Sequence, residues 1–261
     1  MSEIREPAVA GMFYPADAKD LQTMVQGFLG PMDRGEAPKA VIVPHAGYIY
    51  SGSIAASAYR ILARARATIR RIVLLGPSHR VAFEGLALSS ARYFSTPLGN
   101  IPVDQAAYEA IKDLPQVRIV DEAHAMEHSL EVQLPFLQLV LDEFDLVPIV
   151  VGEASPGVVG EVLERLWNGP RTRFVVSSDL SHYHDYQTAK HLDEATSHAI
   201  TTLRFEDIGH DQACGRNPVN GLLKVARAYG MQARTLDQRN SGDTAGPRDR
   251  VVGYGAYAFV E

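Results

Sequence analysis

AVIVPHAGY (residues 40–48) is a short apolar run that ends abruptly in a loop carrying a histidine. Two other stretches have the same form, RIVLLGPSHR (71–80) and FVVSSDLSHYH (174–184). Near-continuous apolar runs of this length are typical of parallel strands covered on both faces. In an open α/β sheet, the loops beyond the carboxyl ends of such strands meet in one crevice, where ligands bind. We therefore expect the three loops to form a single site.

The rest of the chain alternates between strand-like and helix-like segments. Further strands are expected at about 84–90, 117–120, 144–152, 231–240 and 251–260, and helices at about 53–66, 104–114, 128–141, 155–167, 186–203 and 218–229. Strands separated by helices of ten or more residues predict parallel pairing with right-handed crossovers. The expected fold class is therefore α/β, a three-layer α/β/α sandwich with a central mixed, mainly parallel sheet. We expect one domain over residues 1–261.

Capping residues predict where several of these helices begin. Asp104 and Ser155 are expected as N-caps, the second followed by proline at the first helical position. Asn217 and Pro218 give the same signal for a later helix. Pro135 is expected to kink or break the helix at 128–141.

Composition excludes several classes of function. The 25 basic and 31 acidic residues give a net charge of −6, which argues against a broad nucleic-acid surface. A single cysteine excludes an intramolecular disulfide and an all-cysteine zinc site. The first residues are acidic and lack an apolar signal-peptide core, and no apolar run has the length that spans a bilayer. We expect a cytoplasmic protein that binds neither nucleic acid nor membrane.

His45 and His79 hold equivalent positions directly after two of the expected strands. Neighbouring proline and glycine residues let the backbone turn sharply there. A single loop histidine is most simply hydrogen-bonded to a nearby carbonyl. Two histidines in equivalent positions favour ligation of a shared metal ion.

Asp179 and His182 lie three residues apart after the third strand and share a face if that loop turns helically. Asp179 can ligate a metal or orient an imidazole. His182 can ligate a metal or act as a general acid–base near neutral pH. The simpler alternative is an aspartate that caps a turn, but the polar character of this segment favours a functional role.

Two further candidates leave both interpretations open. His128 either belongs to a capping arrangement at a helix N-terminus or lies at a pocket rim with Glu127 or Glu131 as its partner. Cys214 is most simply a small buried hydrophobic residue. Alternatively, a helix dipole and Arg216 lower the pKa of its thiol and make it a soft metal ligand.

Common catalytic motifs are absent from this sequence. It has no GxGxxG after a strand and no GxxxxGK[ST], HExxH, GxSxG or CxxC. Nucleotide binding by standard loops, zincin chemistry and hydrolysis by an elbow serine therefore lose support.

Several motifs in order resemble the Memo family, named for "mediator of cell motility", many microbial members of which are called AmmeMemoRadiSam system protein B. They are REPAVAGMFYPAD, PHAGYIYSGSIAA, LLGPSH, TPLG (96–99), EHSLEVQLPFL, VVSSDLSHY and CGRNPV, and they cover nearly the whole chain. The resemblance implies a fold like that of class III extradiol ring-cleavage dioxygenases, which use non-haem Fe(II). The family's alternative name implies radical-SAM and AMMECR-type partners.

The resemblance also implies roles for particular residues. His45 and His79 match the two histidine ligands, and Cys214 matches the third ligand position of Memo-like proteins. His182 matches the additional active-site histidine, with Asp179 as a neighbour or alternative ligand. The candidate catalytic residues are therefore His182, Asp179 and, from its own sequence context, His128.

The expected function is a mononuclear iron (Fe2+) site, with copper or zinc as alternatives, and redox chemistry on an unknown substrate. A thiolate in place of a carboxylate softens the site and exposes that ligand to oxidation, which argues against ring cleavage. One alternative is a non-catalytic scaffold that binds a peptide or small molecule. Another is a zinc-dependent hydrolase in which His182 is the base.

Overall fold

The three apolar runs form the middle of one large sheet. The computed structural model describes residues 3–31 and 36–261, and within them a nine-stranded sheet has the order β10-β12-β2-β9-β3-β8-β4-β7, with β11 paired to β12. Its four central strands run parallel: β2 (Ala40–Val43), β9 (Thr172–Ser177), β3 (Arg71–Pro77) and β8 (Asp145–Val151). Their apolar side chains are buried, as expected for strands covered on both faces.

Antiparallel strands flank this parallel centre. On one side, β12 (Val251–Val260) pairs antiparallel with β2, with β11 (Gln232–Asn240) and with β10 (His182–His184). On the other side, β4 (Leu86–Leu88) runs antiparallel to β8 and parallel to β7 (Val117–Ile119). The predicted mixed sheet is therefore confirmed.

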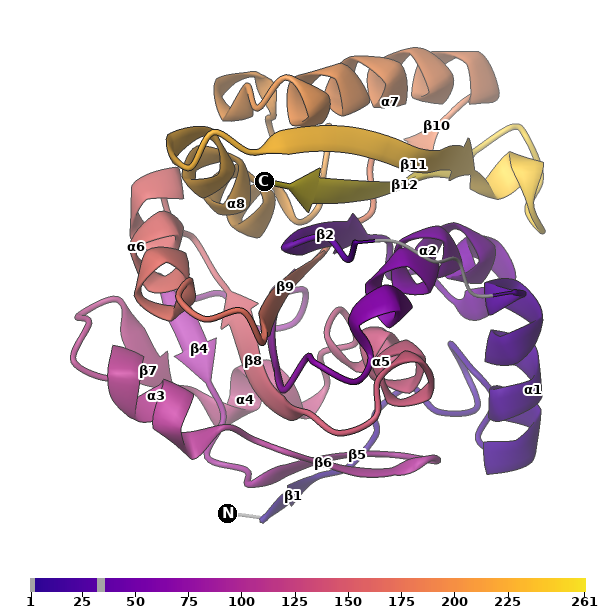
Figure 1. The fold of residues 1–261 in the computed structure, drawn as a ribbon. Coiled ribbons are helices and arrows are strands. Elements are labelled where there is room, and N and C mark those ends of the chain that lie inside the picture. The colour runs from indigo at the N-terminus through magenta and orange to yellow at the C-terminus, as the bar shows by residue number, and fades with distance from the viewer. Residues whose placement is uncertain (1–2, 32–35) are drawn as a thin grey trace.

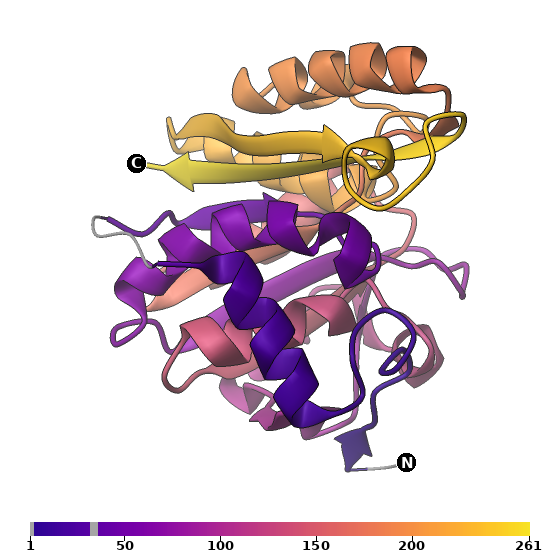
Figure 2. The same ribbon diagram turned by 90° about the vertical axis from the view of Figure 1, so that its right-hand side faces the viewer.

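Helices cover both faces of the sheet (Figure 1). Helices α1 (Ala18–Leu29), α2 (Tyr48–Leu62) and α5 (Leu134–Val140) pack together on one side, whereas α6 (Pro156–Leu166) and α8 (Arg216–Ala228) pack together on the other. The hairpin of β11 and β12 lies between α2 and α7 (Tyr186–Thr201), as Figure 2 shows. This arrangement confirms the predicted α/β/α layers.

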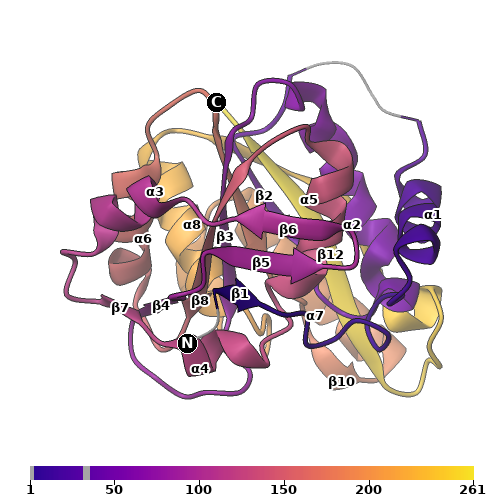
Figure 3. The same cartoon turned by 90° about the horizontal axis from the view of Figure 1, so that it is seen from below.

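The remaining elements lie around this framework. A small sheet of β1 (Ile4–Arg5), β5 (Tyr93–Thr96) and β6 (Gly99–Pro102) is seen from below in Figure 3. The short elements are α3 (Gln105–Ile111), α4 (Asp121–Ala125), η1 (Ala63–Ala65), η2 (Glu131–Gln133), η3 (Phe205–Asp207) and η4 (Ser241–Asp243). In the described part of the chain, no helix combines the length and the apolar character needed to cross a membrane.

The helix starts were predicted with mixed success. The side chains of Asp104 and Ser155 accept backbone N–H groups as N-caps, which confirms both predictions. The prediction for Asn217 is wrong: Gly215 is the N-cap of α8, and the Asn217 amide instead donates to the Gly152 carbonyl. Pro135 lies in the first turn of α5, where its missing N–H costs no helical hydrogen bond, so that helix starts there rather than kinking.

Candidate metal centre

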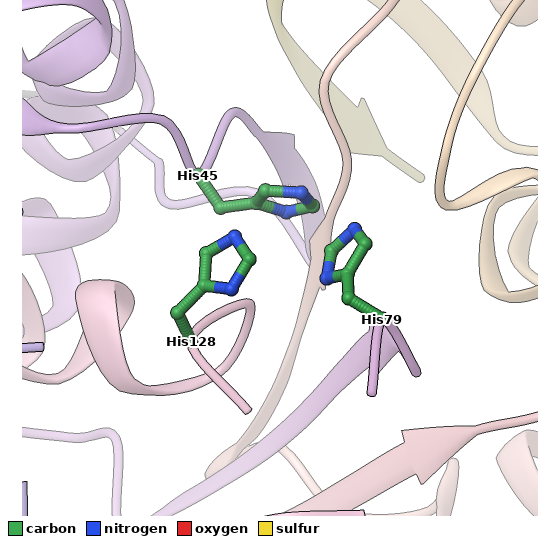
Figure 4. A group of neighbouring side chains, drawn as sticks. All are labelled: His45, His79 and His128. Atoms are coloured by element: carbon green, nitrogen blue, oxygen red, sulfur yellow. The ribbon is translucent and has the colours of Figure 1, made fainter. Parts of the chain in front are cut away.

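Three imidazoles meet at the carboxyl ends of the central strands. His45 lies two residues beyond β2, His79 lies two residues beyond β3, and His128 comes from the loop between α4 and η2. One ligand atom from each ring lies within 4.8 Å of the other two. Figure 4 shows the three rings pointing toward one another. The prediction that the strand-end loops converge therefore holds for His45 and His79.

The hydrogen bonds around His45 determine which ring nitrogen carries its proton. Nδ1 lies 2.9 Å from the Ser177 hydroxyl oxygen. That hydroxyl donates its only hydrogen to the Ser129 carbonyl and accepts another bond from the Gln133 amide. Nδ1 of His45 must therefore be the donor, which leaves the lone pair on Nε2. Burial, reinforced by the neighbouring His79 and His128, keeps the pKa of His45 well below its ordinary value.

A buried carboxylate orients His79. Oε1 of Glu127 lies 2.9 Å from Nδ1 of His79, and Oε2 accepts the His79 backbone N–H at 2.6 Å. Oε1 also accepts the backbone N–H groups of His128 and Ser129. Burial alone would raise the pKa of Glu127, but the hydrogen bonds from His79 and Ser129 outweigh it and lower the pKa to about 2. The ionised carboxylate accepts Nδ1–H, so in the neutral imidazole Nε2 of His79 carries the lone pair, as in metal-binding carboxylate–histidine pairs.

His128 completes the group. Its ring stacks on His79 with centroids 4.7 Å apart and meets His45 edge-on at 5.5 Å. The Phe13 ring packs against the His128 ring, with ring centroids 4.7 Å apart. Burial lowers the pKa of His128 to about 4, with His79 and Arg80 acting in the same direction. Since His45 and His128 are held neutral, their lone pairs are available to a cation rather than blocked by protons.

Cys214 lies beside this group. Its sulfur is 3.3 Å from Nε2 of His45 and 3.7 Å from the Asp179 carbonyl oxygen. Burial raises the pKa of the Cys214 thiol, and the Asp179 carboxylate adds to the effect. Without a cation, the neutral thiol has one hydrogen, which can bond to the Asp179 carbonyl oxygen or to the lone pair on Nε2 of His45. The group whose ligand atoms all lie within 4.8 Å of one another contains His128 rather than Cys214.

Asp179 faces the backbone of His45. Its Oδ1 accepts the His45 N–H at 2.7 Å, and the Ala46 N–H also donates to the carboxylate. Burial raises the pKa of Asp179 to about 7 against the lowering effect of these bonds. Asp179 thus fixes the start of the loop that carries His45. This is an orienting role, one of the two roles that the sequence allowed for Asp179; the other was direct ligation of a metal.

His182 lies next to the group without joining it. Its Nδ1 is 2.8 Å from the Leu180 carbonyl, so this nitrogen is protonated and Nε2 carries the lone pair. Burial lowers the pKa of His182, and His79 contributes in the same direction. The next residue, Tyr183, has a φ of 63°, a strained value for a non-glycine residue. Tyr183 lies where the register of β10 against β12 shifts, between His182 and His184.

The loop that carries Asp179 and His182 is held from α7 by Asp193. The Asp193 carboxylate accepts the Ser181 N–H at 3.0 Å and lies against Gly253, where any side chain would collide with it. Burial raises the pKa of Asp193 from 3.8 to about 6, although the Ser181 hydrogen bonds and His184 act against this.

Replacing Asp193 by asparagine should therefore make stability less dependent on pH. The folded state binds the Asp193 proton more tightly than the unfolded state, so wild-type stability falls as pH rises from about 4 to 6. Asparagine keeps an acceptor for Ser181 but has no charge to bury. In urea unfolding, the free energy of unfolding of Asp193→Asn minus that of wild type should increase by on the order of 2 kcal/mol between pH 4 and pH 7. An equal difference at both pH values would contradict this explanation.

Sequence reasoning missed two residues that orient the candidate ligands. Ser177 holds Nδ1 of His45, and Gln133 donates both to Ser177 and to the Pro44 carbonyl. A polar residue at the end of the buried run FVVSS was the available signal for Ser177. Gln133 gave none, because its contacts join segments far apart in the chain.

The fold and the site together define an α/β protein with a candidate three-histidine metal centre at the carboxyl ends of its parallel strands. The description "Memo-like protein" applies to a family model that matches residues 5–258, and the chain belongs to this family. Among curated relatives, a MEMO1 family protein of Ignicoccus hospitalis is 38% identical over 284 residues, covering 98% of each chain. One from Aquifex aeolicus is 36% identical over 271 residues, covering 98% of this chain and 99% of its own.

A solved structure is similar in fold at low sequence identity. It is the crystal structure of the uncharacterized protein JW3007 from Escherichia coli K12, with a TM-score of 0.56 and 15% identity. The match covers 87% of this chain and all of that one. At this identity the likeness concerns the fold alone.

Proposed function

We propose that this protein binds a single iron or copper ion between His45, His79 and His128 and uses it for redox chemistry on a small substrate. The observation that carries the proposal is the convergence of three imidazoles whose ligand atoms lie within 4.8 Å of one another. Imidazole nitrogen suits iron, copper and zinc. Three protein ligands leave further coordination positions for substrate or dioxygen.

The contacts behind the ligands support a built metal site. His45 and His79 each donate a hydrogen bond from Nδ1–H to a side-chain oxygen. The acceptor is the Ser177 hydroxyl for His45 and the Glu127 carboxylate for His79. Such hydrogen-bond partners fix the tautomer and the orientation of a ligating imidazole, and metal-bound histidines usually have them. A histidine on the protein surface does not need such a partner.

We include Cys214 as a fourth donor. Two ligands on one ion, with metal–nitrogen and metal–sulfur bonds of ordinary length, lie about 3.1 to 3.6 Å apart. The sulfur of Cys214 is 3.3 Å from Nε2 of His45, within that range. A thiolate would favour copper and iron over harder ions. It would also make metal binding release the thiol proton.

The Cys214→Ser variant tests this fourth donor. Serine is similar in size but a poor ligand for soft metals, so we expect metal affinity to fall at least about tenfold. Competition with a chelator of known affinity measures it. Affinity equal to wild type would exclude Cys214 from the coordination sphere and leave the ion to the three histidines.

His182 is the proposed acid–base group. Its Nδ1–H donates a hydrogen bond to the Leu180 carbonyl, so Nε2 is the nitrogen that can accept a proton. Burial keeps the pKa of His182 below its ordinary value, which maintains the neutral, basic form at neutral pH. When bound, the metal would supply electron transfer or activation of a substrate oxygen, and His182 would hold or return the substrate proton.

A second candidate function is metal-dependent hydrolysis. Three histidine ligands with an open position are also the donor set of catalytic zinc, which lowers the pKa of bound water. The two functions differ in the native metal. Zinc as the retained ion, with ester hydrolysis that a chelator abolishes, would favour hydrolysis over redox chemistry.

Metal analysis of the purified protein is the experiment that tests the proposal. The protein should be purified anaerobically without a histidine tag and measured by elemental analysis. We expect close to one iron or copper ion per chain. Wild-type protein that carries no more metal than a variant lacking both His45 and His79 would overturn the proposal.

A further inference from the structure

Arg5 is a buried arginine whose guanidinium hydrogen-bonds to the segment that carries His128. Its Nε donates to the His124 carbonyl at 3.1 Å, and Nη2 donates to the Glu127 carbonyl at 2.6 Å. Its Nη1 forms an ion pair with the Glu131 carboxylate. The three acceptors belong to the segment 124–131, more than a hundred residues away in the sequence.

Glu131 forms a second set of hydrogen bonds between the segment 124–131 and the N-terminal segment. Its side chain is fully buried and accepts the backbone N–H groups of Ala8 and Val9 at 2.7 and 2.9 Å. Its Oε1 also accepts the Tyr14 hydroxyl at 2.7 Å. These donors and the ion pair hold the Glu131 side chain in place, so the guanidinium of Arg5 has a fixed partner.

The segment 124–131, to which Arg5 is bonded, carries two parts of the metal centre. Glu127 orients the ring and backbone of His79, and His128 is itself a member of the three-histidine group. Arg5 holds the backbone on the amino-terminal side of His128 at the 124 and 127 carbonyls and the side chain of Glu131 beyond it. Phe13, from the same N-terminal segment, packs against the His128 ring.

We propose that Arg5 is a positioning residue of the metal centre, which acts by fixing the 124–131 loop and through it His79 and His128. The inference rests on the proposed metal binding. A planar guanidinium can donate to three acceptors in different directions, which a lysine ammonium on a flexible stem does not reproduce. A purely structural ion pair would stabilise the fold without setting the ligand geometry.

Cobalt(II) binding to the full-length protein separates these two roles. Co2+ reports coordination geometry through its visible absorption, and titration gives its affinity. We expect Arg5→Met to weaken Co2+ binding by about 10- to 100-fold and to change the absorption spectrum. The double variant R5M/E131Q removes the negative charge together with its cation, so a buried unpaired charge does not by itself explain its behaviour, and it should show the same loss.

Arg71→Met is the matched control. Arg71 also pairs with a poorly exposed carboxylate, with its Nε 2.6 Å from Oδ2 of Asp104, but it lies at the start of β3, away from the 124–131 loop. We expect this variant to lose thermal stability while keeping wild-type Co2+ affinity and spectrum. Equal loss of affinity in Arg71→Met would overturn the inference, as would Arg5 variants that bind Co2+ like wild type.

Amide hydrogen exchange of the metal-free proteins provides a readout that does not depend on metal binding. We expect faster exchange at residues 127–131 in R5M/E131Q than in wild type or Arg71→Met. Unchanged exchange there would overturn the positioning role. Failure of wild-type protein to bind Co2+, with this exchange difference present, would instead count against the proposed function alone.

Discussion

Replacement of His45 by alanine is expected to abolish stoichiometric metal binding. His45 is buried just beyond the end of β2, and its Nε2 lies 3.3 Å from the Cys214 sulfur. Removing it deletes one of the three proposed ligands and leaves a space that water fills, so affinity should fall by more than about a hundredfold, beyond the loss typical of an outer partner. Metal content after anaerobic purification and dialysis measures the effect.

His191→Ala is the control for that variant. His191 is exposed on α7, so its removal changes the histidine count without touching the site. Its metal content should equal that of wild type. A His45→Ala protein that folds and still retains one ion per chain would show that the ion is bound elsewhere.

The second large effect is expected for Glu127→Gln. The Glu127 carboxylate accepts four N–H groups, two of them from His79. A glutamine has one acceptor oxygen, and its amide hydrogens would face N–H donors. We expect metal affinity to fall about 10- to 100-fold and the free energy of unfolding to fall by about 3 kcal/mol.

Chelator competition and urea unfolding measure the two effects. Glu161→Gln is the matched control, because Glu161 accepts a bond from the Gln116 amide at an exposed position on α6. It should leave both quantities at wild-type values. Wild-type affinity in a folded Glu127→Gln protein would mean that the orientation of His79 does not depend on this carboxylate.

The central sheet and half of the site could be predicted from local patterns. Apolar runs that end in Pro-His or Pro-Ser-His indicate a buried strand and its following loop, and parallel pairing brings such ends together. His45 and His79 follow from this rule. His128 does not, because its loop follows no central strand, and capping was an equally good explanation of Glu127 and Ser129.

Long-range contacts decide what the local patterns left open. The position of His128 depends on a loop that Arg5 holds across more than a hundred residues, and no spacing in the sequence indicates that contact. Asn217 failed as a cap for a similar reason, since the Gly152 carbonyl of another segment takes its amide. Tertiary partners also determine that Asp179 faces the His45 backbone.

A crystal of anaerobically purified protein, with diffraction recorded at the absorption edge of its bound metal, tests the account most directly. We expect one anomalous peak at about 2.0 to 2.2 Å from nitrogen atoms of His45, His79 and His128. A peak at any other place in the molecule, or none in protein that elemental analysis shows to contain metal, would contradict the account.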